Sequence, residues 1–177
     1  LLKFQLPTVS AYPEWKALQK LSKLGIKAPT PLAIISRGFN PANSESIIIT
    51  ESVEPNISIE EILESQLIND VKVNEKRNII KKVAEISRSL HLNGINHRDL
   101  YLCHFLTDKN LDPDKEIFLI DLHRAQFRPK VPMRWAIKDI GGLIHSGMGY
   151  SLTERDLYRF FEVYFDKSLK EFSIKEN

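Results

Sequence analysis

Apolar residues at helical spacing mark several segments of the chain. Between Pro13 and Gly25 one buried helix face is indicated by Trp15, Leu18, Leu21 and Leu24. The proline suits a first helical turn, and the glycine suits a helix end. Residues 75–92 predict a longer helix, with a single apolar stripe formed by Ile79, Val83, Ile86 and Leu90. We predict two further helices near 134–147 and 153–165.

Short apolar runs predict strands. "TPLAIIS" and "SIIITESV" are typical of two strands, and "RGFNPANSE" is typical of the turn between them. After the breaker "EPN", the stretch "SIEEILESQL" predicts a short helix with Ser58 as its N-cap, and Glu61 completes a capping box. "EIFLIDLHRA" predicts a buried strand whose apolar run ends at Asp121.

The order of these elements predicts an α+β fold. Helix, strand pair, connector, long helix, polar loop, strand and further helices follow one another. A chain of 177 residues can form one large domain or two small lobes with a real core. We expect a small, partial N-terminal lobe at residues 1–52 and a mainly helical C-terminal lobe at residues 53–177.

Composition narrows the functional classes. A hydrophobic content of 42% and a charged content of 27% are typical of a globular protein. We see no apolar run long enough to span a membrane and no signal-peptide pattern. The single cysteine, Cys103, rules out an internal disulfide and fits a reducing compartment. The net charge of +2 is too balanced to argue for nucleic acid, and the histidines lack the short spacings of a zinc site.

The candidate chemistry lies in "GINHRDLYLCHFL" and in the later apolar run. Asp99 stands in a loop after the long helix, and Asp121 stands at the end of the predicted strand. Carboxylates that follow apolar segments can be aimed by a packed scaffold. Two of them suit phosphoryl transfer, because one accepts the proton of an attacking hydroxyl while the other holds the magnesium that bridges the nucleotide phosphates.

"GINHRDLYLCHFL" and "LIDLHRAQFRPKVPMRW" together resemble the catalytic and metal-binding loops of the lipopolysaccharide core heptose kinases. The resemblance continues through "PEWKALQKLSKLGI", "IIITESV" and "GGLIHSGMGYSLTERDLYRF", so it covers nearly all of the chain. It implies a protein-kinase-like two-lobe fold and an ATP- and magnesium-dependent transfer to a heptose of the lipopolysaccharide inner core. It also implies a cytoplasmic protein in peripheral contact with the inner membrane.

The resemblance assigns roles at the catalytic centre. Asp99 matches the catalytic-loop aspartate, and Asp121 matches the metal-binding aspartate. His104 replaces the metal-binding asparagine of the wider superfamily, in agreement with the heptose kinases. An imidazole is a poorer magnesium ligand than oxygen, which disfavours direct coordination by His104. The sequence leaves open whether His104 contacts the metal, contacts a phosphate or orients Asp99. His97 and Arg98 are expected to structure the loop.

The resemblance also assigns supporting roles. Glu14 matches the helix glutamate that pairs with the nucleotide-binding lysine, while Glu51 and Val53 match the hinge that holds adenine. Asp139 resembles the aspartate that braces the catalytic loop from beneath. The glycine-rich phosphate loop and the lysine-bearing strand are absent from this sequence. We therefore expect these 177 residues alone to bind ATP weakly and to be inactive.

A basic segment follows the metal-binding aspartate. From Leu122 to Lys138 the chain has no acidic residue, and its cations include Arg124, Arg128, Lys130 and Arg134. Such a run forms either a solvated face or a binding site for an acceptor rich in phosphate and acidic sugar, to which arginine binds with bidentate bonds. The same cations favour an anionic membrane surface.

Three alternatives to the heptose kinase remain. A kinase of another small hydroxylated acceptor would keep the same two aspartates. A pseudokinase that serves as a binding module would explain the missing lysine strand. A nucleic-acid module is disfavoured, because no aromatic strand platform accompanies the cations. The sequence leaves the oligomeric state open.

Overall fold

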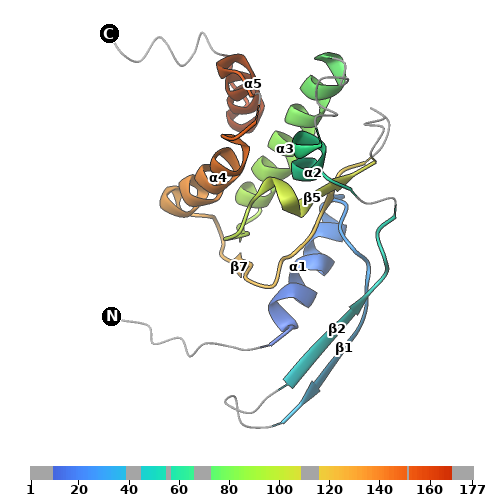
Figure 1. Ribbon diagram of the computed structural model, residues 1–177. Helices are drawn as coiled ribbons and strands as arrows, with labels where there is room; N and C mark the ends of the chain where they lie inside the picture. The colour runs from blue at the N-terminus through green and yellow to red at the C-terminus, as the bar shows by residue number, and fades with distance from the viewer. Residues whose placement is uncertain are drawn as a thin grey trace.

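The structure is a computed structural model (Figure 1). It describes residues 10–38, 45–54, 57–65, 73–108, 116–150 and 152–168. The opening of the predicted N-terminal lobe, residues 1–9, and the predicted turn at 39–44 lie outside the described residues.

The N-terminal part consists of one helix beside a two-stranded hairpin. Helix α1 (Tyr12–Lys23) has the predicted proline in its first turn. Gly25 follows it with a φ of 69°, a left-handed conformation that glycine adopts without a Cβ penalty. Strands β1 (Pro31–Arg37) and β2 (Glu45–Thr50) pair antiparallel, as predicted. Figure 1 shows this hairpin at the opposite end of the molecule from α5.

The connector leads from β2 into the second part of the chain. Strand β3 (Ile57–Ser58) is followed at once by helix α2 (Ile59–Glu64). The backbone N–H of Glu61 donates to Ser58 Oγ over 3.0 Å, and the backbone N–H of Ser58 donates to Glu61 Oε2 over 2.8 Å. The predicted capping box is therefore confirmed.

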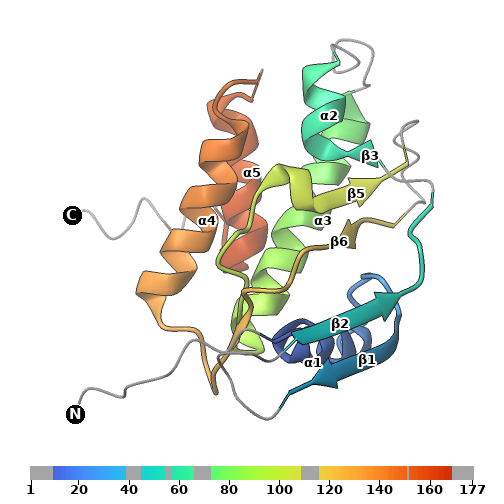
Figure 2. The same ribbon diagram turned by 60° about the horizontal axis from the view of Figure 1, so that its bottom comes forward.

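Three longer helices form the C-terminal part. They are α3 (Val73–Leu92), α4 (Met133–Gly147) and α5 (Glu154–Phe165). Figure 2 shows α5 beside α3, and α4 along the outer side of the helical part. The predicted stripe of α3 faces inward, because Val83 and Leu90 are buried and Ile79 and Ile86 pack against the core.

Short strands carry the loops that matter for the site. Strand β4 (Ile95–Asn96) pairs with β7 (Gln126–Phe127). The 3-10 turn η2 (Leu102–His104) leads into β5 (Phe105–Thr107), which pairs with β6 (Phe118–Leu119) and with β3. The prediction of a strand that reaches Asp121 was wrong: β6 ends at Leu119, and Asp121 has a left-handed φ of 60° that no strand accommodates.

One hydrophobic core connects the two parts. Ala17, Leu18 and Leu21 of α1 belong to the same buried cluster as Leu90 of α3 and Leu122. The backbone N–H of Leu119 also donates to the carbonyl of Lys27 over 2.9 Å. The α+β prediction is confirmed, while the division at residues 1–52 and 53–177 stays a prediction.

Candidate active site

Asp99 lies in the loop between β4 and η2, and its neighbours hold this loop in place. Arg98 has a left-handed φ of 78°, which is unusual for a residue with a side chain. Leu100 is buried, and full burial of a leucine side chain contributes about 1.5–3 kcal/mol. The Asp99 side chain itself is 12% exposed, so the carboxylate is oriented but reachable.

Asp121 is presented in the same way on the segment after β6. Its φ of 60° turns the chain sharply, and the next residue, Leu122, is fully buried. The Asp121 side chain is 37% exposed. One carboxylate oxygen, Oδ1, contacts Nδ1 of His123. In both loops an apolar anchor directly after the aspartate fixes where the carboxylate points.

His104 joins the two aspartate loops. Its Nδ1 lies 2.8 Å from the backbone carbonyl oxygen of Asp99, and its Nε2 lies 3.2 Å from Asp121 Oδ2. A carbonyl oxygen only accepts, so the proton of this bond is on Nδ1. The backbone N–H of Ile120 donates to the carbonyl of His104 over 3.0 Å. The structure thus brings Asp99, His104 and Asp121 together, although they are far apart in the sequence.

Arg124 occupies one side of the catalytic carboxylate. Its Nη1 donates to Asp99 Oδ1 over 2.7 Å. Sequence reasoning placed Arg124 with the acceptor-binding cations, whereas the structure pairs it with Asp99. This charge-assisted bond leaves Asp99 Oδ2 as the oxygen available to an incoming hydroxyl.

Asp139 of α4 braces the catalytic loop. Its Oδ2 accepts from Asn96 Nδ2 over 2.7 Å, from the backbone N–H of His97 over 2.9 Å and from His91 Nε2 over 3.1 Å. Its Oδ1 accepts from the backbone N–H of Arg98 over 2.9 Å. Only 2% of Asp139 is exposed, so all four bonds are shielded from water. The geometry agrees with the bracing role that the resemblance implied.

A second layer of hydrogen bonds fixes the brace itself. His91 Nδ1 lies 2.6 Å from the hydroxyl of Tyr164, so α5, α3 and α4 are linked in series. Burial by itself raises the pKa of Asp139, but hydrogen bonds from His91 and Asn96 hold that pKa below its usual range. Burial, with the charge of Asp139, raises the pKa of Tyr164 to about 12, so this phenol stays a proton donor.

His97 is a structural histidine. It is fully buried, and burial lowers its pKa, so the ring is neutral. Its Nε2 lies 3.2 Å from the carbonyl oxygen of Ile120, and its ring stacks on His104 at 5.8 Å between centroids. Its Nδ1 is buried without a hydrogen-bond partner among the described residues. His97 therefore supports both His104 and the segment before Asp121.

Glu14 of α1 lies close to the metal-binding loop. Burial raises the pKa of its carboxyl, and the negative charge of Asp121 raises it further. His123 and a hydrogen bond from the backbone N–H of Leu122 act in the opposite direction. The structure therefore brings Glu14 to the segment of Asp121, while the pairing with a nucleotide-binding lysine that the resemblance implied stays a prediction.

The predicted hinge residues lie directly after β2. Glu51 is exposed, and its backbone N–H donates to the carbonyl of Thr30 over 2.9 Å. Val53 is half-buried in the connector. Their position between the hairpin and β3 is that of a hinge, and their contact with adenine stays a prediction.

The predicted basic surface divides into two groups. Arg128 Nη1 contacts Asn96 Oδ1 at 3.3 Å, and its guanidinium lies over the Trp135 ring at 5.4 Å. Arg128 is thus engaged with the brace of the catalytic loop. Lys130 and Arg134 are exposed, and the guanidinium of Arg134 also lies over the Trp135 ring, at 5.2 Å. These two cations remain available to an acceptor.

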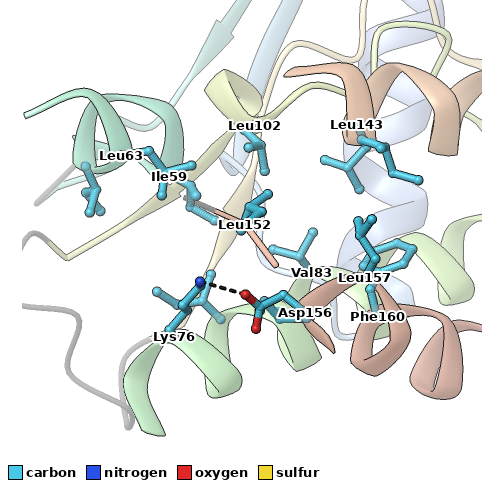
Figure 3. A pocket seen from close by; sticks show the side chains of 14 residues that line it. Ile59, Leu63, Lys76, Val83, Leu102, Leu143, Leu152, Asp156, Leu157 and Phe160 are labelled. Atoms are coloured by element: carbon cyan, nitrogen blue, oxygen red, sulfur yellow. Dashed lines mark ion pairs between the residues drawn. The ribbon is translucent and has the colours of Figure 1, made fainter. Parts of the chain in front are cut away.

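An apolar cavity lies among α2, α3, α4 and α5, and neither Asp99 nor Asp121 lines it (Figure 3). It measures about 90 Å³, and its wall is almost entirely aliphatic and aromatic, including Ile59, Val83, Leu143 and Phe160. Among the described residues that line it, Lys76 and Asp156 carry a charge, and they form a 2.6 Å ion pair that Figure 3 marks with a dashed line. A cavity whose wall is almost entirely apolar, and whose two charged residues are paired with each other, is suited to an apolar ligand.

Two further observations bear on metals and membranes. Within the described ranges, no cluster of three or more His, Cys, Asp or Glu side chains is arranged to hold a metal ion by itself. In the same part of the chain, no helix combines the length and the apolar composition needed to cross a bilayer.

Sequence reasoning missed three contributors to the site. Asn96 and His91 hold Asp139, and His123 contacts Asp121. One signal for Asn96 was available, because an amide directly before "HRD" in an otherwise apolar stretch has to find a buried partner. His91 shows no comparable local signal, because its partners Asp139 and Tyr164 come from distant segments. His123 stands only two residues after Asp121, so its contact was within reach of the sequence.

Two aspartate loops, joined by a histidine and braced from a helix behind them, define the site of a protein-kinase-like phosphotransferase. Comparison with known proteins supports this class of protein. Residues 1–164 match the model of the lipopolysaccharide kinase (Kdo/WaaP) family, and the chain belongs to this family.

Its relatives are named kinases. The chain is 40% identical over 181 residues to the lipopolysaccharide core heptose(I) kinase WaaP of Escherichia coli strain K12, a match that covers 100% of this chain and 68% of that protein. It is 38% identical over 174 residues to WaaP of Pseudomonas aeruginosa strain PAO1, covering 97% and 65%. A solved structure, WaaP in complex with acyl carrier protein, matches with a TM-score of 0.82 at 35% identity, covering 94% of this chain and 70% of that one.

Proposed function

We propose that this protein transfers the γ-phosphate of ATP to a hydroxyl of a heptose in the lipopolysaccharide inner core. The observation that carries the proposal is the link through His104, which contacts Asp99 on one side and Asp121 on the other. The named activity of the relatives supports heptose as the acceptor.

Asp99 is the base in this proposal. Arg124 holds Oδ1, so Oδ2 receives the proton of the sugar hydroxyl as that oxygen attacks the γ-phosphorus. A positioned base contributes about 10²–10⁴-fold to the rate. His104 acts as a positioning residue, because it bonds the backbone of Asp99 and its other nitrogen faces Asp121.

The residues around Asp121 fit a magnesium ion. Mg²⁺ binds through one or two carboxylates together with substrate phosphates, and here Asp121 and Glu14 bring two carboxyl groups close to each other. The charge of Asp121 raises the pKa of Glu14, so a cation between them would relieve their repulsion. When bound, magnesium neutralises charge on the transferring phosphoryl group. We assign Asp121 as the side chain that would bind the magnesium ion.

The nucleotide and the acceptor approach from different sides in this proposal. The backbone of Glu51 and Val53 meets the adenine edge at the hinge. Lys130 and Arg134 meet acidic groups of the lipopolysaccharide core, because exposed cations suit phosphate and carboxylate. We place the reaction at the cytoplasmic face of the inner membrane, where ATP and a membrane-anchored acceptor meet.

The test uses the full-length polypeptide, because these residues alone are expected to bind ATP weakly. Asp121→Asn is expected to abolish magnesium-dependent phosphate transfer to lipopolysaccharide core that lacks heptose phosphate. Asp99→Asn is expected to lower kcat about 10²–10⁴-fold, a barrier increase of about 3–6 kcal/mol, with little change in the KM for ATP. Wild-type turnover in either variant would remove that aspartate from its assigned role.

Two comparisons complete this test. Glu85→Gln is the matched control, because Glu85 is an exposed carboxylate of α3 whose ion-pair partner is Lys81. It is expected to behave as wild type. Arg134→Ala is expected to raise the KM for the core acceptor more than the KM for ATP. Turnover with free sugars or amino alcohols but not with core would support another small acceptor, and ATP binding without turnover would support a binding module.

We also propose that the chain binds acyl carrier protein, because the matching solved structure is that of WaaP in complex with acyl carrier protein. The apolar cavity supports this proposal, since the acyl chain of a carrier protein is an apolar ligand and the wall of the cavity is almost entirely apolar. Calorimetry with acylated and unacylated carrier protein tests it. Tighter binding of the acylated form is expected, and equal affinity would exclude the cavity as the acyl site.

A further inference from the structure

The outer face of α4 has an unusual composition. Its inner face is formed by buried residues that include Ala136, Ile140 and Leu143. On the outer face Met133 is 66% exposed and Ile137 is 61% exposed. An exposed helix face of a globular protein normally carries polar side chains of both charge signs.

The polar residues of this face are mainly basic. Arg134 and Lys138 are exposed, and they alternate with Met133 and Ile137 along the helix. The one acidic residue of α4, Asp139, points inward to the catalytic loop. The solvent side of α4 therefore presents methionine, isoleucine, arginine and lysine without a carboxylate.

An apolar groove extends this face toward the neighbouring helices. Met133 also lines a groove whose walls include Leu92 at the end of α3 and Phe165 at the end of α5. Leu92 is 58% exposed and Phe165 is 40% exposed. Lys130 lies at the same groove. Figures 1 and 2 show α4 on the outer side of the helical part, where no other described element covers it.

The cations of this face are held in place by an aromatic ring. Arg134 and Lys138 lie over Trp135 at 5.2 and 4.9 Å from its ring. Across the described residues, neither of them nor Lys130 forms an ion pair with a carboxylate, whereas Arg88 at the groove is paired with Asp166. The charge of three cations is therefore available to an anionic partner.

We infer that this face, made of Met133, Arg134, Ile137 and Lys138 with the adjoining groove, docks the protein on the anionic surface of a phospholipid bilayer. The inference rests on the proposed function, in which the acceptor is a glycolipid. Alternating apolar and basic side chains suit the boundary between headgroups and acyl chains, where the former insert and the latter meet lipid phosphates.

Docking through this face places the site next to the membrane. Trp135 lies between the outer cations and Arg128, and Arg128 contacts Asn96, which bonds the brace of the catalytic loop. An enzyme held in this way receives the sugar part of a glycolipid beside Asp99 while its lipid part stays in the bilayer. The bilayer is a better match than an acidic protein, because two large exposed apolar side chains, Met133 and Ile137, lie beside the cations in the first turns of α4.

The test measures co-sedimentation of the full-length polypeptide with vesicles of phosphatidylethanolamine and phosphatidylglycerol, and with vesicles of phosphatidylcholine alone. Binding is expected only to the anionic vesicles and is expected to weaken with salt. Lys138→Glu changes the charge by two, so it is expected to lower binding about 25-fold, at roughly fivefold for each charge. Ile137→Asp is expected to lower binding about tenfold or more.

Matched controls carry the same changes on other exposed surfaces: Lys23→Glu on α1 and Tyr158→Asp on α5. They are expected to bind vesicles as wild type does. The inference is overturned if Ile137→Asp and Lys138→Glu bind like their controls. It is also overturned if wild type ignores anionic vesicles but binds an acidic carrier protein through this face, or self-associates through it in sedimentation velocity.

A second measurement separates this inference from the proposed function. Ile137→Asp is expected to phosphorylate a deacylated, water-soluble core oligosaccharide at the wild-type rate and to lose rate only on acceptor embedded in vesicles. Equal rates on both acceptors would contradict the docking role. Failure of wild type to phosphorylate any core acceptor would contradict the proposed function, and the vesicle-binding result would stand independently.

Discussion

The brace of the catalytic loop offers the sharpest test of how this site is built. Asp139→Asn keeps the size of the side chain and replaces one carboxylate oxygen by an NH₂ group. Asp139 accepts four hydrogen bonds, three at Oδ2 and one at Oδ1. If the amide oxygen takes the position of Oδ2, its NH₂ group faces the backbone N–H of Arg98, so two donors meet and neither is satisfied.

The size of the effect follows from these contacts. A hydrogen bond to a charged acceptor contributes about 1.5–3 kcal/mol, and a buried donor without a partner costs about 1–3 kcal/mol. Because the remaining three bonds persist to a neutral acceptor, we expect a loss of about 3 kcal/mol in the free energy of unfolding. Stability of natural domains is about 5–15 kcal/mol, so the variant should still fold.

Catalysis should suffer in the folded variant. Asp139 holds the backbone at His97 and Arg98, directly before Asp99. A displacement of the base by about 1 Å costs on the order of 10²-fold in rate, so kcat should fall by about that factor while the KM for ATP changes little. Arg98 is held at a left-handed φ of 78°, which the loosened loop can relax.

Unfolding in guanidinium, followed by fluorescence, measures the free energy of unfolding. ATP turnover in the full-length polypeptide measures kcat. Asp166→Asn is the matched control, because Asp166 is an exposed carboxylate paired with Arg88, and exposed pairs contribute about 0–1 kcal/mol. A loss of stability below about 1 kcal/mol in Asp139→Asn, with normal kcat, would refute the bracing role.

Three further predictions concern stability. Gly94→Ala should prevent folding or cost several times more in thermal stability than Gly25→Ala. Both glycines have a positive φ, but a Cβ at Gly94 would lie 1.8 Å from the carbonyl oxygen of Arg128, whereas nothing lies within 4 Å at Gly25. Equal losses of thermal stability would mean that the backbone at Arg128 moves to accommodate the Cβ. Burial raises the pKa of Asp156, but hydrogen bonds from a lysine and a helix cap outweigh it and lower the pKa from 3.8 to about 2. This depressed pKa contributes about 2 kcal/mol to the free energy of unfolding above pH 3.8, and the contribution is lost as the pH falls toward 2. Asp156→Asn should therefore be less stable than wild type at neutral pH, and this difference in stability should disappear in acid. A difference that stays constant with pH would contradict the link between the pKa and stability. Ser58→Ala should cost about 1 kcal/mol in urea unfolding through loss of the N-cap, and no change would show that the cap is dispensable.

Local features of the chain were sufficient to predict the helices and the two aspartates. The apolar stripe of α3, the capping box at Ser58 and the glycine after α1 depend on residues within a few positions of one another. The aspartates are recognisable because each of them follows apolar residues in the sequence. Resemblance to a known family supplied their roles, which spacing alone could not assign.

Only the tertiary structure decided how these elements meet. The sequence does not show that His104 joins the loops of Asp99 and Asp121, or that Arg124 pairs with Asp99. It also does not show that the outer side of α4 lacks a carboxylate because Asp139 turns inward. Periodicity reports which face of one element is apolar, whereas a hydrogen bond between distant segments depends on how the whole core packs and brings those faces together.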